Sequence, residues 1–244
     1  MEIRKSPLLL LLLFFSILSV WSCQNTPNSG GATQPYEDTT KQEEEYGADD
    51  ILPRKPQYPG IDSDYVNTNR VIWQKPEVVI NLLGDLSNKT VADIGAGTGF
   101  FAFRMAQKAK KVIAIDIDPR FISYLDSVRV LELPEQYQDR LETRLALPDD
   151  PKLQPNEANV VIIVNTFMYI KNQTEYLENL KKGIAPGGML LIIDFKKKRT
   201  PLGPPSNIRV PLFQIEEQLY KAGYRDIQTN DTALDYQYIV TARR

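Results

Sequence analysis

Three glycines at alternate positions follow a short apolar run in the segment VADIGAGTGFF, residues 91–101. Because glycine has no side chain, Gly95, Gly97 and Gly99 let the backbone turn sharply and let another molecule approach it closely. The carboxylate of Asp93 stands just before this turn. A glycine-rich turn after a buried strand is typical of loops that bind nucleotides or nucleotide-like cofactors. The segment therefore predicts a cofactor loop.

Two common ligands fit the details of this loop poorly. A phosphate-binding loop requires a lysine followed by serine or threonine after its second glycine, whereas Phe100 and Phe101 follow Gly99. The dinucleotide fingerprint G-x-G-x-x-G would place its third glycine at the position of Phe100. An oxidoreductase that uses NAD is therefore the least favoured interpretation.

The composition excludes several other kinds of chemistry. The chain of 244 residues contains no histidine, so imidazole serves neither as a base nor as a metal ligand. A single cysteine, Cys23, rules out an intramolecular disulfide and a thiolate-rich zinc site, and we predict no metal site. The net charge of −2 gives no general electrostatic reason to bind nucleic acid, so we do not predict a nucleic-acid partner.

Predicted strands and helices alternate from about residue 62 onward. The strands are predicted at 91–94, 112–117, 141–145, 160–164 and 189–194, and the helices at 73–83, 101–109, 121–130, 174–182 and 212–222. This alternation indicates a parallel sheet with helices on both faces. Two last strands, near 227–229 and 236–241, have no helix between them, and such neighbours pair antiparallel. We therefore expect an α/β fold with a doubly wound, mostly parallel seven-stranded sheet and one antiparallel strand near the C-terminus.

The loop DIGAGTG, Asp93–Gly99, resembles the cofactor loop of class I S-adenosylmethionine-dependent methyltransferases. Three later segments follow in the order that this family shows, namely VIAIDIDP, VVIIVNTFMYI and LKKGIAPGGMLLIIDF. The resemblance extends over most of residues 62–244. It implies a Rossmann-like methyltransferase fold, S-adenosylmethionine as the cofactor, and methyl transfer to a small molecule or protein that the sequence does not identify.

The resemblance also implies roles for residues at the ends of strands. Asp93 is expected to accept a hydrogen bond from the amino group of the cofactor, and Asp116 from both ribose hydroxyls. Asp149 or Asp150, after the third strand, stands where the family contacts the adenine ring. Ligands of such sheets bind at the carboxyl ends of the strands, and all of these residues are predicted there.

Two residues after the fourth strand are the candidates for a catalytic role. Asn165 is expected to line the floor beneath the transferred methyl group, and Tyr169 stands where relatives often carry histidine. Both residues also have a structural interpretation, since asparagine is common in turns and tyrosine can pack at a pocket wall. A non-catalytic module that binds S-adenosylmethionine or S-adenosylhomocysteine at the membrane is the alternative function, which the absence of histidine and the export signal described below support.

The N-terminal residues have the pattern of an export signal. Arg4 and Lys5 precede the apolar stretch 8–20, which is shorter than the about 20 apolar residues that cross a bilayer. The stretch leads to Cys23 and resembles a bacterial lipoprotein signal, in which the cysteine is lipidated and becomes the new N-terminus. An uncleaved membrane anchor is the alternative.

A segment poor in aliphatic residues follows Cys23, and it cannot bury enough surface to order itself. We therefore expect a signal peptide at 1–22, a lipid-anchored disordered tether at 23–61 and a methyltransferase domain at 62–244. The expected location is the periplasmic or cell-surface side of a bacterial membrane, to which lipidated Cys23 attaches the chain.

Overall fold

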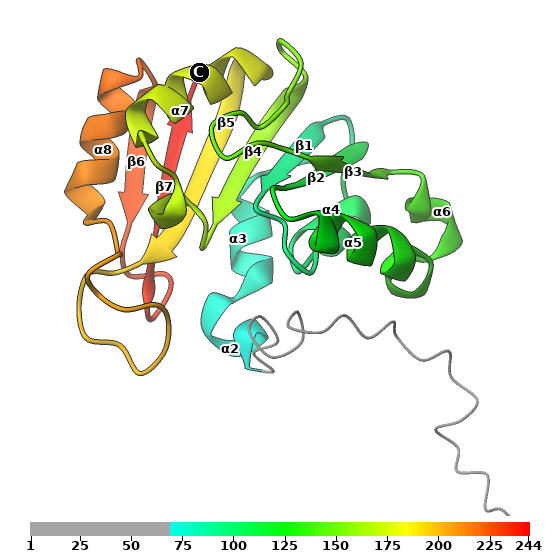
Figure 1. The fold of residues 1–244 in the computed structure, drawn as a ribbon, viewed down its shortest axis with the longest axis horizontal. Helices are drawn as coiled ribbons and strands as arrows, with labels where there is room; N and C mark the ends of the chain where they lie inside the picture. The colour runs from blue at the N-terminus through cyan, green and yellow to red at the C-terminus, as the bar shows by residue number, and fades with distance from the viewer. Residues whose placement is uncertain (1–68) are drawn as a thin grey trace, which may run out of the picture. The chain divides into compact units, whose positions relative to one another are not determined.

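The computed structural model describes residues 69–244, which form one seven-stranded sheet with helices on both faces (Figure 1). The predicted signal peptide, Cys23 and the tether lie outside the described residues. The strands are β1 (Thr90–Ile94), β2 (Lys111–Asp116), β3 (Leu141–Leu145), β4 (Ala158–Val164), β5 (Ile184–Phe195), β6 (Arg225–Asn230) and β7 (Gln237–Arg243). Their order in the sheet is β3-β2-β1-β4-β5-β7-β6.

The direction of the strands confirms the predicted topology. Strands β1 to β5 pair parallel to one another, whereas β7 runs antiparallel to both β5 and β6. One strand of the seven therefore opposes the rest, as the missing helix between the last two strands indicated. The carboxyl ends of β1, β2, β4 and β5 consequently lie along one edge of the sheet.

Helices cover the two faces of the sheet and build two separate hydrophobic clusters. The helices are α2 (Arg70–Gln74), α3 (Pro76–Leu82), α4 (Ala102–Ala106), α5 (Pro119–Glu132), α6 (Glu135–Gln138), α7 (Gln173–Gly183) and α8 (Leu212–Lys221), with a 3-10 turn, η2, at Phe167–Tyr169. Helices α3, α4 and α5 pack with one cluster, and α7 and α8 with the other. Along β4, Ile162 belongs to the first cluster and Ile163 to the second, so the strand is buried on both faces.

The predicted helix 73–83 is wrong in one respect, because it is two helices. The chain breaks at Lys75, whose φ of 46° lies in the left-handed region. Pro76 causes this break, since the ring of a proline disfavours helical geometry in the residue before it. The break lets Trp73 join the cluster beneath α7 and α8, while Val79 of α3 joins the opposite one.

The predicted strand 189–194 starts earlier than expected, because the segment Ala185–Gly188 before it also lies inside β5. Gly187 has a φ of 72°, and the pairing register of β4 shifts between Ala158 and Val160. These features indicate a bulge rather than a separate turn, because a bulge accommodates an extra residue without ending the strand. The single-turn helix α6 was not predicted.

Candidate cofactor and acceptor site

The glycine loop continues directly from β1 and is tied to the neighbouring strand. The backbone N–H groups of Gly95 and Ala96 both donate to the carbonyl of Ile115 in β2, at 2.8 and 3.0 Å. Gly95, Gly97 and Gly99 have φ values of 73°, 54° and 81°. Residues with side chains rarely adopt these values, so the loop needs glycine at all three positions.

The surroundings of the three glycines differ, and the difference locates the open part of the loop. A Cβ atom at Gly95 would lie 2.3 Å from Oγ1 of Thr166, and one at Gly99 would lie 2.5 Å from the ring of Phe103. A Cβ atom at Gly97 would have no neighbour within 4 Å. Packing inside the protein therefore requires the first and third glycines, whereas Gly97 borders open space.

Asp116, the last residue of β2, lies against this open part of the loop. Its carboxylate accepts hydrogen bonds from the backbone N–H groups of Gly97, at 2.9 Å, and Asp118, at 3.0 Å. Burial raises the pKa of Asp116, and these hydrogen bonds oppose that shift. Since each carboxylate oxygen has two lone pairs, acceptor capacity is left for the hydroxyls of a ligand.

Asp93 is the more deeply buried carboxyl group of the site, with 3% of its surface exposed. Burial raises its pKa to about 7, while the nearby charge of Arg70 lowers it and that of Asp116 raises it further. The carboxylate also accepts the backbone N–H of Ala102, the first residue of α4. Asp93 therefore binds the first N–H of α4 and interacts electrostatically with Arg70 and Asp116.

These residues fit the cofactor that the sequence implies. S-adenosylmethionine has an ammonium group and ribose hydroxyls, which carboxylates such as Asp93 and Asp116 bind through charge-assisted hydrogen bonds. The open space at Gly97 lets the ligand meet bare backbone. Asp93, Asp116 and the glycine loop are accordingly the residues that would hold it.

The predicted adenine contacts, Asp149 and Asp150, lie in a turn after β3. Asp149 and Asp150 follow β3 in a turn that is closed by two hydrogen bonds between the backbones of Leu147 and Asp150. The carboxylate of Asp150 pairs with Lys152 at 2.7 Å, which holds its pKa below the usual range. Asp149 is exposed, and its carbonyl accepts a hydrogen bond from Asn179 of α7. A role for either residue in holding the adenine stays a prediction.

The loop after β4 brings the predicted catalytic residues to the same edge as the glycine loop. Asn165 has a φ of 59°, and its N–H donates to the carbonyl of Ile193 at 2.8 Å. The next residue, Thr166, is the one that packs against Gly95. Tyr169, at the end of η2, is 62% exposed. Asn165 is therefore fixed beside the glycine loop, and Tyr169 lies at the surface.

Two buried glutamines, which the sequence analysis did not single out, connect Asn165 to α2. Gln74 and Gln237 are both fully buried. Nε2 of Gln74 donates to Oε1 of Gln237 at 3.0 Å, and Nε2 of Gln237 donates to Oδ1 of Asn165. The signal available in the sequence is that each glutamine stands among apolar neighbours, in RVIWQ and QYIV, where a polar residue is unusual.

Arg70 was also missed, and it lies at the other end of this chain of amides. Its Nε donates to Oε1 of Gln74, and its guanidinium lies 4.2 Å from the ring centre of Phe100. The guanidinium of Arg104 lies 4.1 Å from the same ring centre. Burial lowers the pKa of Arg70 to about 10, so it is cationic at neutral pH.

A further carboxyl group, Asp194, ends β5 at the same edge. It is fully buried, and one of its oxygens accepts the N–H of Met168 at 3.0 Å. Its Oδ1 has no hydrogen-bond partner within residues 69–244, and burial raises its pKa well above the usual range. Asp194 therefore supports η2 through the N–H of Met168.

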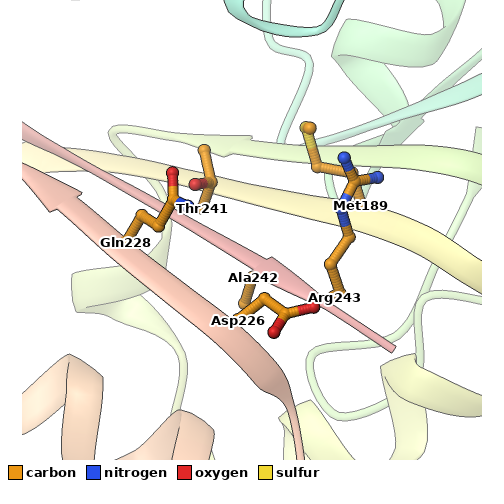
Figure 2. A pocket seen from close by; sticks show the side chains of 6 residues that line it. All are labelled: Met189, Asp226, Gln228, Thr241, Ala242 and Arg243. Atoms are coloured by element: carbon orange, nitrogen blue, oxygen red, sulfur yellow. The ribbon is translucent and has the colours of Figure 1, made fainter.

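A shallow hollow lies at the opposite edge of the sheet (Figure 2). It is lined by Met189, Asp226, Gln228, Thr241, Ala242 and Arg243, from β5, β6 and β7. Met189 lies in the first half of parallel β5, so the hollow is remote from the glycine loop. Among the described residues no group of acidic, cysteine or histidine side chains is arranged to hold a metal ion. None of the helices in this part of the chain is long and apolar enough to span a membrane.

The fold and this site define a class I methyltransferase, and comparison with known proteins agrees. The sequence model of the family described as "Methyltransferase domain" matches residues 85–235, more than half of the chain. The chain belongs to this family. The protein is an S-adenosylmethionine-dependent methyltransferase, and S-adenosylmethionine is its cofactor.

Solved structures with the same fold include a SAM-dependent methyltransferase from Aquifex aeolicus. The two proteins share 26% sequence identity with a TM-score of 0.65, over 72% of this chain and 92% of the other. Phosphoethanolamine N-methyltransferase 2 of Haemonchus contortus, solved with S-adenosyl-L-methionine, has a TM-score of 0.57 at 14% identity, over 70% of this chain and 52% of that one. At that identity the second likeness concerns the fold alone.

Two similar curated proteins are each named tRNA U34 carboxymethyltransferase. The one from Wolinella succinogenes is 26% identical over 197 residues, which are 72% of this chain and 65% of the relative. The one from Cellvibrio japonicus is 27% identical over 165 residues, which are 66% of this chain and 50% of the relative. This chain thus spans between half and about two thirds of their length.

Proposed function

We propose that this methyltransferase acts by alignment, with Asn165 orienting the acceptor and Tyr169 contacting it at the surface. The observation that supports this role is the position of the loop after β4. Thr166 packs against Gly95 of the glycine loop, and Asn165 directly precedes it. The cofactor supplies a methyl group that its sulfonium has already activated. The protein then has to hold the acceptor in line with that group.

Alignment without a strong base agrees with the residues at this edge. The chain has no histidine, and burial raises the pKa of the Asp194 carboxyl group well above its usual range. Correct alignment of two reactants can lower a barrier by roughly 7–11 kcal/mol. A neutral hydrogen-bonding group such as the Asn165 carboxamide is suited to this task, because it orients an acceptor without exchanging a proton.

The test begins with labelled S-adenosylmethionine and a panel of cell-extract fractions, which identifies the acceptor. Single-turnover transfer is then measured for Asn165→Ala and Tyr169→Phe, beside calorimetric titration with S-adenosylhomocysteine. A small misplacement of the acceptor can cost about a hundredfold in rate, whereas cofactor affinity should stay within a few-fold. Tyr220→Phe, at an exposed position of α8, is the control and should leave the rate unchanged. Unchanged rates in both site variants would contradict the proposal.

A second candidate acceptor is tRNA, which the names of the relatives suggest. The net charge of the chain gave no reason to predict it. Lys197, Lys198 and Arg199 are exposed on the loop after β5, at the same edge as the glycine loop. No ion pair within residues 69–244 includes them. The buried Arg209 fixes this loop by donating to the carbonyls of Lys196 and Lys198, each at 3.0 Å. Phosphates of a nucleic acid would be attracted to such a fixed cationic loop.

Total tRNA and labelled S-adenosylmethionine test this candidate directly. Label should enter the RNA, and replacing residues 197–199 by serine should weaken tRNA binding and make it less dependent on salt. Replacing Lys108 and Lys110, cations that follow α4, by serine is the control. Absence of label in the tRNA would leave the unidentified acceptor as the proposed one.

We also propose that the chain is a lipoprotein, with residues 1–22 removed and Cys23 lipidated at the periplasmic or cell-surface side of a bacterial membrane. The support is the sequence of the N-terminal segment alone. This proposal and the tRNA acceptor exclude one another in the same molecule, because tRNA is cytoplasmic. Cell fractionation therefore bears on both proposals.

A further inference from the structure

Arg70 is a cation at the cofactor site, and within residues 69–244 only part of its guanidinium has a hydrogen-bond partner. Within the described residues its hydrogen bonding is limited to Nε, which donates to Gln74. Its terminal nitrogens, Nη1 and Nη2, are not among the buried polar atoms that lack a partner. Because no hydrogen bond of these nitrogens is found within residues 69–244 either, they are exposed and can donate to another molecule.

The position of this guanidinium is fixed on two sides. The ring of Phe100 lies under it at 4.2 Å, and the ring of Phe101 lies 5.9 Å away. Gln74 is itself held by Gln237, so Nε of Arg70 points to a rigid acceptor. A planar group that is stacked and bonded in this way loses little further freedom when it binds a planar anion.

The charges around Arg70 leave it incompletely neutralised. Asp93 is the acidic group that interacts with it, and Arg104 repels it. Since the pKa of Asp93 is about 7, this carboxyl group is only partly ionised at neutral pH. A cation removed from water needs a matching negative charge, and a bound anion can supply it.

The other cations near the site are already occupied. Arg104 donates through Nη1 to the carbonyl of Phe100 at 2.6 Å. Lys75 pairs with Asp235 at 3.1 Å and also donates to the carbonyl of Ala233. Among these three cations, Arg70 is thus the one that interacts with Asp93 and has terminal N–H groups without a hydrogen-bond partner within residues 69–244.

The amino-acid end of the cofactor carries an ammonium and a carboxylate on the same carbon atom. When Asp93 holds the ammonium, the carboxylate must lie close by. We propose that Arg70 binds this carboxylate through its terminal nitrogens, and that Gln74 and Phe100 are positioning residues for it. The protein then presents a carboxylate and a guanidinium that match the opposite charges of the ligand. The inference concerns the cofactor and does not depend on which acceptor is methylated.

Calorimetry with two ligands tests this assignment on the full chain purified in detergent. One ligand is S-adenosylhomocysteine, and the other is its decarboxylated analogue, which keeps the amino group. The wild type should bind S-adenosylhomocysteine about ten- to a hundredfold more tightly, as charge-assisted hydrogen bonds allow. In Arg70→Gln this preference should vanish, because affinity falls for S-adenosylhomocysteine and is unchanged for the analogue.

Two further variants sharpen the result. Arg104→Gln removes a guanidinium from the same ring and should keep the preference for the carboxylate. Arg70→Lys keeps the charge without the fork and should retain part of the preference, which also covers the case in which Arg70→Gln does not fold. An equal loss for both ligands in Arg70→Gln, or no loss for either, would overturn the inference alone. A wild type that binds neither ligand would overturn it together with the cofactor assignment.

Discussion

Binding of the cofactor should weaken as the pH falls below about 7, because that is the pKa of Asp93 in the free protein. The ammonium group of S-adenosylmethionine favours the ionised carboxylate. At lower pH, Asp93 is protonated in the free protein and must lose its proton when the cofactor binds. The sign follows from this linkage, since binding that releases a proton is weakened by acid.

The size of the effect follows from the fraction of Asp93 that is ionised. With a pKa of about 7, half of the molecules are ionised at pH 7, and roughly one in a hundred at about pH 5. If only the ionised form binds well, affinity falls roughly fiftyfold between these two pH values, or about 2.3 kcal/mol. Measurements should stop below about pH 7.7, where the amino group of the ligand loses its own charge.

Calorimetric titration with S-adenosylhomocysteine measures this dependence in two buffers of different ionisation enthalpy. The wild type should release close to one proton per ligand bound at about pH 6. Asp93→Asn should bind more weakly near neutral pH, and its affinity should be nearly independent of pH. Asp116→Asn is the control, because the pKa of Asp116 is also raised by burial. This variant should keep the pH dependence if Asp93 is the group that titrates. A wild type with equal affinity at pH 5 and pH 7, or an Asp93→Asn variant with the full slope, would refute the reasoning.

Three further variants test the loop and the N-terminal segment. Asp116→Ala should lower the affinity for S-adenosylhomocysteine at least about tenfold by calorimetry, because charge-assisted hydrogen bonds contribute about 1.5–3 kcal/mol each. Gly95→Ala should lower the melting temperature, because the new methyl group meets Thr166 in a left-handed turn. A double variant with Thr166→Ala, which removes Oγ1 and Cγ2, should recover only part of the loss, since the backbone strain remains. Cys23→Ala should leave the protein unprocessed or release it from the membrane fraction. Mass spectrometry that finds an intact Met1 in membrane-extracted wild type would contradict the lipoprotein proposal.

The sheet was predictable because the pattern of neighbouring residues indicates where each strand lies. The segment 160–164 is an unbroken apolar run, as expected of a strand buried on both faces, and β4 is such a strand. The place of β7 followed from the missing helix before it. The break at Lys75 could also have been predicted, since Pro76 follows it. The helical spacing of apolar residues continues across both helices, however, and this spacing indicated a single helix.

The site was predictable only where chemistry and strand ends coincide. Asp93 is the residue before the last of β1 and Asp116 is the last of β2, so their position beside the glycine loop follows from topology alone. Arg70 lies before the first strand, and nothing in its local sequence shows that α2 folds back over Phe100. Gln74 and Gln237 are far apart in the sequence, and their pairing exists only in the folded protein.

The pairing of these glutamines determines which way the side chain of Asn165 faces. A guanidinium can only donate, so Gln74 must turn its oxygen towards Arg70 and its nitrogen towards Gln237. Gln237 then has its nitrogen free for the oxygen of Asn165. Each amide is thereby oriented by the one before it, although the two ends of an isolated amide look alike. The amino group of Asn165 is the end that remains for the acceptor. A methyl acceptor aligned by this residue therefore presents it with a hydrogen-bond-accepting oxygen or nitrogen.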